Sequence, residues 1–470
     1  MGESVLLAPD DVGPIPIPKS VQQALSDPIY GQKWREACLE EIRGEYEINR
    51  AWEIVTTVPS GNRVMKGKWV FKVEYNLDGT VKRFKARWVG CGYSQVQGVN
   101  FGETYASTLG IAPTRVFFAA CAVADLDIEE GDVIKAFSTA DMDEYNVYVE
   151  QPHGFADPTG VACKLLRPLE GTKQAAHLFS TSNAKWLVDV MKFSRSSTEP
   201  NIYWKTVDGS TIRACVYVDN VLTAFEKNAA GRKLNEDFWT QYGERFNTER
   251  RGPPKRFLGM EIARKDRRIT LTQEKYITDA GAKFLNGVTS KTCSTPVHYS
   301  QLEAFTKITT ASNDVERAAM QSKAYLSLCG TLLWATISHP EIAYYVSFIC
   351  QFMHDPSLAA WDAGITILTY LQSVKSIGIT YDGENPTFVV FTDSSFGQAP
   401  VPFGGHVVMF AGGAISFQAR KLKLVPQSSM EAETACYSVG SKDVVYMSNV
   451  IGSDGMQLDM TKPITTYCDN

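Results

Sequence analysis

Residues 216–225 read VYVDNVLTAF, a stretch fit for burial that carries a carboxylate and an amide, Asp219 and Asn220, at its centre. Asn and Asp tolerate the positive φ that a two-residue hairpin turn demands, and the flanking residues are typical of β-strands. The pattern therefore predicts a tight hairpin turn at Asp219 and Asn220. A metal site, with Asp219 held out at the hairpin tip, is the alternative, and this stretch by itself does not separate the two.

The composition is that of a globular protein, with 44% hydrophobic and 21% charged residues, and 470 residues predict about three domains. The N-terminal residues lack the pattern of a secretory signal, and the longest apolar run, VFFAACAVA from Val116, falls short of the roughly 20 residues of a membrane helix. The ten cysteines form no CxxC pair, which is typical of free thiols in a reducing compartment. We therefore expect an intracellular protein, cytoplasmic or nuclear, that is neither secreted nor membrane-bound.

Local patterns alternate between helix and strand along the chain and predict an α+β protein. A Pro-rich tail precedes an amphipathic helix, and strand and turn signals follow from Trp52. Helices and hairpins then alternate up to the basic segment ERRGPPKR at 249–256, which is typical of a domain junction. Residues 320–373 are mainly helical in pattern, and a final block of strands begins at Thr387 and is followed by one more helix.

The segment VKRFKARW alternates strictly between cationic and apolar residues. Its cations, Arg83, Lys85 and Arg87, share one face of a predicted strand and span about 13 Å at roughly 3.3 Å per residue. A solvated strand face above a buried aromatic side is one interpretation. The wider window from Arg63 to Arg87 holds eight Lys or Arg residues against one Glu and one Asp, and this excess favours binding of a polyanion such as a phosphate backbone or a triphosphate.

Acidic residues at the ends of predicted strands are candidate metal ligands. Asp132 in GDVIKAF follows a predicted strand, where it also fits a helix N-cap. Asp132 and Asp219 could converge on two Mg²⁺ ions, which prefer hard oxygen ligands. The C-terminal part offers Asp393 in VVFTDSS, Glu431 in SSMEAET and Asp469 in TTYCDN. Each of these three also has a structural interpretation, because Glu431 completes an S-x-x-E capping box and the two Asp residues fit turns.

Motifs of different composition follow one another in a single order from about Trp34 to the last residue. They are KWVFKVEYNLDGTVKRFKARWVGCGYSQVQGVNFGETYA, DVIKAF, VYVEQPHGF, KQA, VYVDN, RFLGMEI, HPEIAYYVS and SSMEAET. In this order the chain resembles the copia-type retrotransposon Pol polyprotein, over its reverse transcriptase followed by its ribonuclease H. The resemblance implies a right-hand polymerase with fingers, palm and thumb, then a connection segment and a truncated ribonuclease H-like α/β domain.

The resemblance also implies roles for the acidic residues. Asp132 matches the family's Asp after the first palm strand, and Asp219 matches the leading Asp of its Tyr-Val-Asp-Asp hairpin, so the turn and the metal site are the same object. Asp393, Glu431 and Asp469 match the first three metal-binding carboxylates of the ribonuclease H. Both sites are then expected to hold two Mg²⁺ or Mn²⁺ ions and to perform two-metal phosphoryl transfer.

Positions outside the metal sites match the family's substrate-binding segments. The cations that match the fingers strand for nucleotide and template are Arg83, Lys85 and Arg87. The residues that match its template- and nucleotide-positioning motif are Gly171, Lys173 and Gln174. The implied partners are an RNA template, a DNA primer, an RNA–DNA hybrid and dNTPs, in a virus-like particle in this family. The segments expected on this basis are a tail over 1–29, fingers and palm over 30–248, thumb and connection over 249–385, and ribonuclease H over 386–470.

The chain departs from the family pattern at several of these positions. Asn220 replaces the second Asp of the hairpin, which keeps an oxygen ligand but removes one negative charge and is expected to lower metal affinity. Where the family reads LYGLKQAPRxW, this chain reads LEGTKQAAHLF, with Glu170 for an aromatic residue, Ala176 for Pro and His177 for Arg. The chain also stops one residue after Asp469, and we expect a ribonuclease H fold without its fourth carboxylate and final helix.

Three interpretations of the function remain open at this point. The chain is an RNA-directed DNA polymerase with ribonuclease H activity, a degenerate copy without catalysis, or a nucleic-acid-binding module without turnover. The basic residues between Arg63 and Arg87 support the binding module, whereas the net charge of −5 does not. Binding that is independent of Mg²⁺ would favour the module over the enzyme.

Overall fold

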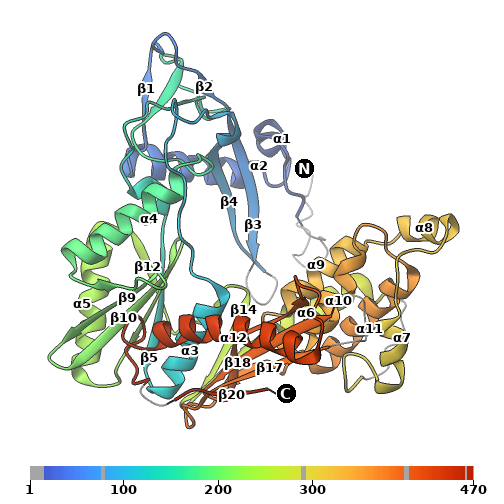
Figure 1. Ribbon diagram of the computed structural model, residues 1–470. Coiled ribbons are helices and arrows are strands. Elements are labelled where there is room, and N and C mark those ends of the chain that lie inside the picture. Colours follow the sequence, from blue (N-terminus) through green and yellow to red (C-terminus); the bar gives the residue numbers. More distant parts are fainter. Residues whose placement is uncertain (1–14, 76–79, 287–292, 396–401, 461–462, 469–470) are drawn as a thin grey trace, which may run out of the picture. The chain divides into compact units, whose positions relative to one another are not determined.

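The computed structural model describes residues 15–75, 80–286, 293–395, 402–460 and 463–468 (Figure 1). Helices and strands are interspersed along the chain, which confirms the predicted α+β class. The chain forms two compact units, each built from segments that are separated in sequence. The first unit takes residues up to 107, 133–192 and 241–249, and the second takes residues 108–132, 193–240 and 250 onward.

The first unit begins with two helices, α1 (Val21–Ser26) and α2 (Gly31–Ile42), and α2 continues into the π-helical turn η2 (Arg43–Ile48). Ser20 caps α1, since its hydroxyl accepts a hydrogen bond from the main-chain N–H of Gln23 at 3.2 Å. Ala24 of α1 is buried in the core of the unit. The segment predicted as a tail over residues 1–29 thus contains a short helix, and the bounds of the tail remain a prediction.

A long hairpin packs on α2 in the first unit (Figure 1). Its strands are β3 (Gly67–Tyr75) and β4 (Val81–Gly90). The buried aromatic residues of both strands face the helix, and Trp34 of α2 makes edge-on ring contacts with Phe71 and Phe84 at centroid distances of 5.2 and 4.7 Å. The alternation predicted for VKRFKARW is confirmed, since the apolar side of β4 is core and the cationic side is not.

Short strands and helical segments complete the first unit. Four strands form a sheet in the order β1-β7-β6-β2. They are β1 (Trp52–Val55), β2 (Val64–Met65), β6 (Tyr148–Val149) and β7 (Ala162–Leu165). The helical segments are η3 (Gly92–Ser94), η4 (Ala136–Thr139), α4 (Ala175–Lys185) and η5 (Trp186–Val190).

A six-stranded sheet with the order β12-β5-β11-β10-β9-β8 carries the predicted VYVDN hairpin. Its strands are β5 (Asp127–Val133), β8 (Ser194–Arg195), β9 (Ile202–Val207), β10 (Ser210–Tyr217), β11 (Asn220–Phe225) and β12 (Thr248–Gly252). Two helices accompany these strands in sequence, α3 (Ile111–Val123) and α5 (Ala229–Arg245). The strands β8 to β11 follow one another in sequence, whereas β5 pairs between β11 and β12, which come from later in the chain, and this pairing brings their end residues together.

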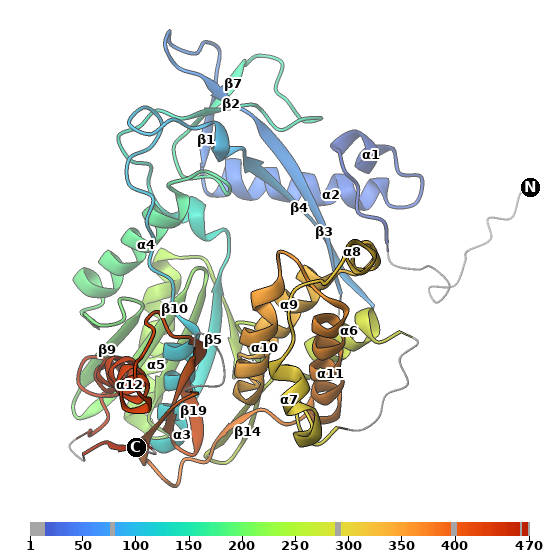
Figure 2. The ribbon, with the colours of Figure 1, turned by 45° about the vertical axis from the view of Figure 1, so that its right-hand side comes forward.

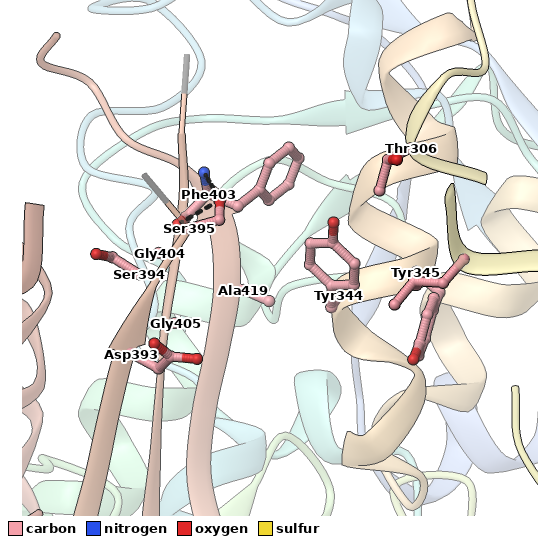
Figure 3. Close-up of a pocket in the computed structure, with 11 residues that line it drawn as sticks. Thr306, Tyr344, Tyr345, Asp393, Ser394, Ser395, Phe403, Gly404, Gly405 and Ala419 are labelled. Carbon is pink, nitrogen blue, oxygen red and sulfur yellow. Dashed lines mark hydrogen bonds between the residues drawn. The ribbon is translucent and has the colours of Figure 1, made fainter. Parts of the chain in front are cut away.

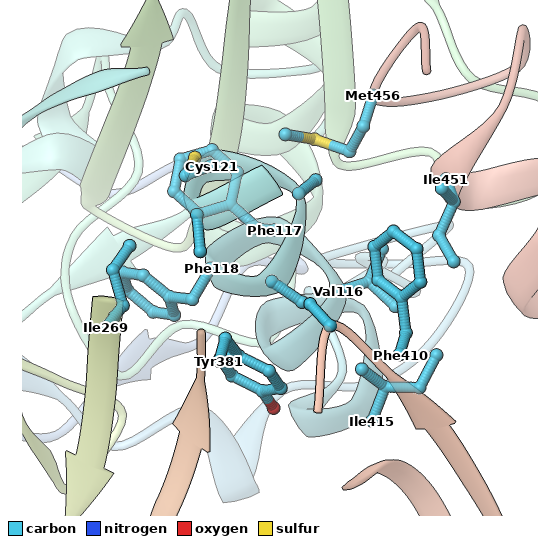
Figure 4. Packing of buried hydrophobic residues seen from close by; sticks show 14 of the residues in the cluster. Val116, Phe117, Phe118, Cys121, Ile269, Tyr381, Phe410, Ile415, Ile451 and Met456 are labelled. Atoms are coloured by element: carbon cyan, nitrogen blue, oxygen red, sulfur yellow. The ribbon is translucent and has the colours of Figure 1, made fainter. Parts of the chain in front are cut away.

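The main core of the second unit surrounds α3, whose residues 113–122 are all buried. Figure 4 shows Phe117 and Phe118 of this helix among side chains from the sheets around it, including Tyr381 and Phe410. A helix that is apolar on every side is stable only when other elements cover all of it. Its one charged residue, Arg115, is 4% exposed and donates two hydrogen bonds to the main-chain oxygen of Ile337, at 2.6 and 3.2 Å.

A helical part with its own core follows the sheet in sequence (Figure 2). It lies in sequence between the third and fourth strands of a four-stranded sheet with the order β13-β14-β15-β16. These strands are β13 (Arg256–Phe257), β14 (Met260–Lys265), β15 (Arg268–Thr272) and β16 (Ile379–Tyr381). The helices are α6 (Glu274–Phe284), η6 (Tyr299–Gln301), α7 (Leu302–Thr306), α8 (Asp314–Gln321), α9 (Tyr325–Ala335), η7 (Pro340–Ile342), α10 (Ala343–Ile349), η8 (Cys350–Phe352) and α11 (Leu358–Val374).

The C-terminal sheet has the order β19-β18-β17-β20, with β17 and β20 parallel. Its strands are β17 (Phe388–Ser394), β18 (Phe403–Phe410), β19 (Gly413–Lys421) and β20 (Thr465–Tyr467). The long helix α12 (Ser429–Ile451) packs on β17 and β18. The side chains beneath α12 belong to the same core as α3, and one break between the two compact units falls between Glu249 and Arg250. The division into fingers, palm, thumb and ribonuclease H segments remains a prediction.

None of the helices in the described part of the chain combines the length and the apolar character that crossing a membrane requires. All ten cysteines lie within the described ranges, and all are free thiols. Burial raises the pKa of several of these thiols, for example that of Cys38 to about 12. Such thiols behave as small core residues rather than as nucleophiles.

Candidate functional site

The hairpin β10–β11 and the strand β5 bring two of the predicted site residues together. Asn220 is the first residue of β11 and lies directly opposite Asp132 of β5 in the antiparallel register. Directly opposed residues in such a pair have Cβ atoms about 4.5–5.5 Å apart. Asp219 is adjacent in the turn, so the three residues form one cluster at this edge of the sheet, which we call the palm cluster.

The turn itself differs by one residue from the prediction. Tyr217 pairs with Asn220, so the two turn residues are Val218 and Asp219, and Asn220 already belongs to the strand. Val218 has a φ of 54°, a left-handed conformation that is costly for a β-branched residue. Strain of this kind costs on the order of 1–3 kcal/mol and concentrates at functional sites. The hairpin fixes Asp219 at the tip and Asn220 on the side facing Asp132.

A hydrogen bond and an ion pair engage side chains of the palm cluster. The side-chain Nδ2 of Asn220 donates to Oδ1 of Asp219 at 3.1 Å. Nη2 of Arg251, on β12, lies 3.0 Å from Oδ2 of Asp132, and its Nη1 lies 3.8 Å from Oε1 of Glu130. Burial raises the pKa of the Glu130 carboxyl, and the charge of Arg251 partly offsets this effect. Glu130 and Arg251 were not predicted as site residues, since the pairing of β12 with β5 cannot be read from local sequence.

A cavity of about 750 Å³ adjoins the palm cluster. Its walls combine cations with aromatic rings. They also include Asn220 of the palm cluster and Glu130, which lies on the same strand as Asp132. The cations are Arg251, Lys255 and Arg256, and the aromatic residues are Tyr217, Phe257 and Trp334. Cations and ring faces together suit phosphate and base groups.

The exposed side of the β3–β4 hairpin gathers five cations, Lys68, Lys72, Arg83, Lys85 and Arg87, which we call the basic face. The register places Lys72 opposite Lys85, a like-charged pair that an isolated hairpin would avoid. Three of the predicted residues are engaged by carboxylates: Arg83 and Lys85 lie 2.7 and 3.5 Å from the carboxylate of Glu74, and Arg87 lies 3.0 Å from that of Glu170. Burial and the nearby Arg87 lower the pKa of Lys85. The local charge is thus positive even with Glu74 and Glu170 in place.

The predicted positioning motif forms a turn that holds a neighbouring loop. Gly171 has a φ of +89°, and a Cβ there would lie 2.3 Å from the main-chain oxygen of Gly90. Gln174 is fully buried, accepts a hydrogen bond from Nε2 of Gln95 at 3.0 Å and donates one to the oxygen of Asn100 at 3.0 Å. Lys173 donates to the oxygen of Gln95 at 3.4 Å. The motif therefore shapes the loop around residues 95–100.

The sequence comparisons place this geometry in a known family. A family model described as reverse transcriptase (RNA-dependent DNA polymerase) matches residues 49–299 of the chain. The chain belongs to the reverse transcriptase family. The match covers the basic face, the positioning motif and the palm cluster, and the family generally uses divalent metal ions.

Curated relatives confirm the resemblance to copia-type Pol polyproteins. The retrovirus-related Pol polyprotein from transposon TNT 1-94 of Nicotiana tabacum is 29% identical over 96% of this chain and 34% of its own length. That from transposon RE1 of Arabidopsis thaliana is 28% identical over 96% of this chain and 30% of its own. The chain thus spans about a third of these relatives. A solved foamy viral protease-reverse transcriptase in complex with double-stranded DNA is similar over 97% of this chain and 76% of that one, at 11% identity and a TM-score of 0.46.

In the C-terminal part of this chain, Asp393 lies on β17, in the wall of a cavity of about 530 Å³. Figure 3 shows Asp393 beside Gly405, with Tyr344 and Tyr345 of α10 on the other side of the cavity. Asp469, the other predicted Asp of this site, lies outside the described residues.

The two glutamates of SSMEAET have different roles in the structure. Glu431 forms the capping box, since its main-chain N–H donates to the Ser428 hydroxyl at 3.2 Å and its Oε2 accepts from the N–H of Gln427 at 2.7 Å. Glu433 is 4% exposed and reaches β17, where its Oε1 accepts from the N–H and hydroxyl of Ser394 at 2.9 and 2.6 Å. Its other oxygen lies 3.5 Å from Sγ of Cys468. Glu433 thus contacts Ser394, the residue that follows Asp393. The sequence patterns did not single out this glutamate of the helix.

Both predicted metal sites supply hard oxygen ligands, as Mg²⁺ and Mn²⁺ require. The palm cluster has two carboxylates and one amide, and the C-terminal cavity has Asp393 with Glu433 close by. Within the described ranges, no group of three or more His, Cys, Asp and Glu side chains is arranged to hold a metal ion. In the palm cluster, Asn220 supplies an amide where the family pattern has a second hairpin Asp. The donor set still fits a divalent cation with reduced charge.

Proposed function

We propose that this chain performs RNA-directed DNA synthesis, adding dNTPs to a DNA primer along an RNA template. The observation that carries the proposal is the register that sets Asn220 opposite Asp132, with Asp219 at the adjoining tip. A paired strand and a strained two-residue turn fix these oxygen ligands before any substrate arrives, and such preorganisation is the main contribution a protein makes to phosphoryl transfer.

Two divalent cations, when bound, would lower the pKa of the primer 3′-hydroxyl and neutralise charge on the dNTP phosphates. Asp132 and Asp219 would hold them through carboxylate oxygens. Asn220 donates its Nδ2 to Asp219, which leaves its Oδ1 as the ligand atom. The cationic and aromatic walls of the cavity at Lys255, Arg256 and Trp334 suit the phosphate and base of a nucleic-acid end.

The basic face of the first unit would bind template phosphates and the triphosphate of dNTPs. Within the described residues, Lys68 and Lys72 form no ion pair, so their charges are available to an anion. A polyanion on this face would relieve the repulsion between Lys72 and Lys85. Because phosphate contacts are independent of base sequence, we expect RNA to be recognised by backbone and shape.

Primer extension on a poly(rA)–oligo(dT) substrate with Mg²⁺ or Mn²⁺ tests the proposal. We expect extension by the chain, loss of extension in Asp132→Asn, and faster extension in Asn220→Asp. Asp127→Asn is the matched control, because Asp127 is on the same strand but at the opposite parity, and so faces away from the palm cluster. Equal rates for Asp132→Asn and Asp127→Asn would contradict the proposal.

We further propose ribonuclease H activity, with Asp393 and Glu433 as metal-binding carboxylates and Asp469 as a third. The burial of Glu433 and its bonds to Ser394 support its assignment over Glu431, whose carboxylate is engaged in the capping box. The test is cleavage of the labelled RNA strand of an RNA–DNA hybrid. Glu433→Gln should abolish cleavage while Glu431→Gln should preserve it in folded protein, and the reverse result would restore Glu431 as the ligand.

A nucleic-acid-binding module without turnover is the second candidate. The amide at Asn220 and the ion pair between Arg251 and Asp132 favour it, since both reduce the negative charge that a metal would meet. This candidate predicts RNA binding that is unchanged by EDTA, together with no extension even in Asn220→Asp. Extension by either protein would exclude it.

A further inference from the structure

Arg251 is paired with Asp132, a predicted metal ligand of the palm cluster. Its side chain is 41% exposed, whereas the side chains of its two carboxylate partners, Asp132 and Glu130, are 22% and 10% exposed. One guanidinium therefore bridges two acidic residues of β5 and presents its remaining surface to the adjoining cavity. An arginine held in this way satisfies carboxylate oxygens that would otherwise be available to a divalent cation.

Its sequence neighbour Arg250 has different contacts. Nη2 of Arg250 lies 2.9 Å from the carboxylate of Glu129 and 2.8 Å from that of Glu236. Successive residues of a strand point to opposite faces, so the two arginines of β12 separate to the two sides of the sheet. Arg250 thus provides a control of the same charge on the same strand, and within the described part of the chain its ion pairs are with Glu129 and Glu236 rather than Asp132.

We propose that Arg251 competes with divalent metal for Asp132, and that a nucleic-acid phosphate in the adjoining cavity relieves the competition. This inference rests on the proposed function, because it concerns the metal of the same site. Two cations cannot both approach one oxygen of Asp132 closely. A phosphate near Lys255 and Arg256 offers the Arg251 guanidinium a bidentate partner, and metal affinity then depends on bound nucleic acid.

The test is Mn²⁺ binding, measured from the electron paramagnetic resonance signal of free Mn²⁺, with folding checked by circular dichroism. Arg251→Gln should bind Mn²⁺ about tenfold more tightly at this site. Changing a residue that contacts a metal-binding side chain typically alters metal affinity by about 10- to 100-fold, and we expect the lower end of this range. Arg250→Gln should stay within about twofold of the unchanged chain. Asp132→Asn combined with Arg251→Gln should lose the gain.

A short DNA duplex should tighten Mn²⁺ binding by the unchanged chain and have little effect on binding by Arg251→Gln. The DNA itself binds Mn²⁺, so the Mn²⁺ bound in a mixture of DNA and the Asp132→Asn protein is subtracted from each measurement. Equal or weaker binding by Arg251→Gln, or a gain that persists without Asp132, would overturn the inference. Binding is read without turnover, so failure of primer extension with an intact Arg251 effect would reject the polymerase proposal and leave this inference standing.

Discussion

Removal of Lys68 and Lys72 from the basic face should weaken the salt dependence of RNA binding by a calculable amount. Glu74 and Glu170 partly neutralise the other three cations of this face, whereas these two lysines have no ion pair within the described residues. Each phosphate neutralised on a single strand contributes about −0.7 to the slope of log K against log salt. The double variant Lys68→Ala/Lys72→Ala should therefore have a slope smaller by about 1.4.

Over a fourfold rise in salt, from about 50 to 200 mM, this difference corresponds to about sevenfold in affinity. Fluorescence anisotropy with a labelled single-stranded RNA at several KCl concentrations measures it. The control is Lys233→Ala/Lys275→Ala, which removes the same charge from exposed positions on α5 and α6. The reasoning is refuted if both double variants have the slope of the unchanged chain, or if both reduce it equally.

Three further predictions concern stability. Val218→Gly should raise the free energy of unfolding measured in urea by about 1 kcal/mol, because the relief of strain at a φ of 54° (on the order of 1–3 kcal/mol) exceeds the backbone-entropy cost of a glycine (roughly 0.5–1 kcal/mol), and an unchanged or lower value would contradict the strain. Gly171→Ala should destabilise the protein by clearly more than Gly61→Ala, since both have positive φ but only the first Cβ meets a main-chain oxygen, at 2.3 Å. The hydrogen bond from His406 outweighs burial and lowers the pKa of the Asp443 carboxyl in the folded protein. The ionised carboxylate therefore stabilises the folded state fully above its unfolded pKa of about 3.9, and this stabilisation is lost as the pH falls through the folded pKa. Between about pH 5 and 3 the unchanged chain should therefore lose stability faster than Asp443→Asn, and parallel losses would argue against it.

Local patterns in the sequence predicted the elements that depend on local chemistry. The alternation of VKRFKARW became β4, and the block of strands predicted from Thr387, with one more helix after it, became β17 to β19 and α12. The hairpin was also predicted, but its turn was placed one residue too late. The preference of Asn for positive φ suggested Asn220, whereas the register with β5 and β10 keeps Asn220 in the strand and forces Val218 into that conformation.

The features that sequence patterns missed depend on which strands become neighbours. Arg251 had only the signal of a basic junction, and its contact with Asp132 arises because β12 lies beside β5. Glu433 lacked any local signal, while Glu431 carried a strong capping pattern that the structure confirms as a cap. Burial against β17 distinguishes the two glutamates, and burial of a polar residue is a property of the assembled unit.

Iron-mediated cleavage of the chain tests most directly whether the palm cluster binds metal. Fe²⁺ bound in place of Mg²⁺ generates hydroxyl radicals with ascorbate and peroxide, and these cut the main chain next to the site. If the palm cluster binds metal, we expect cuts near Asp132 and near the turn at Val218 and Asp219, suppressed by excess Mg²⁺ and lost in Asp132→Asn. Cuts confined to other segments, or cuts at these positions that persist in Asp132→Asn, would contradict it.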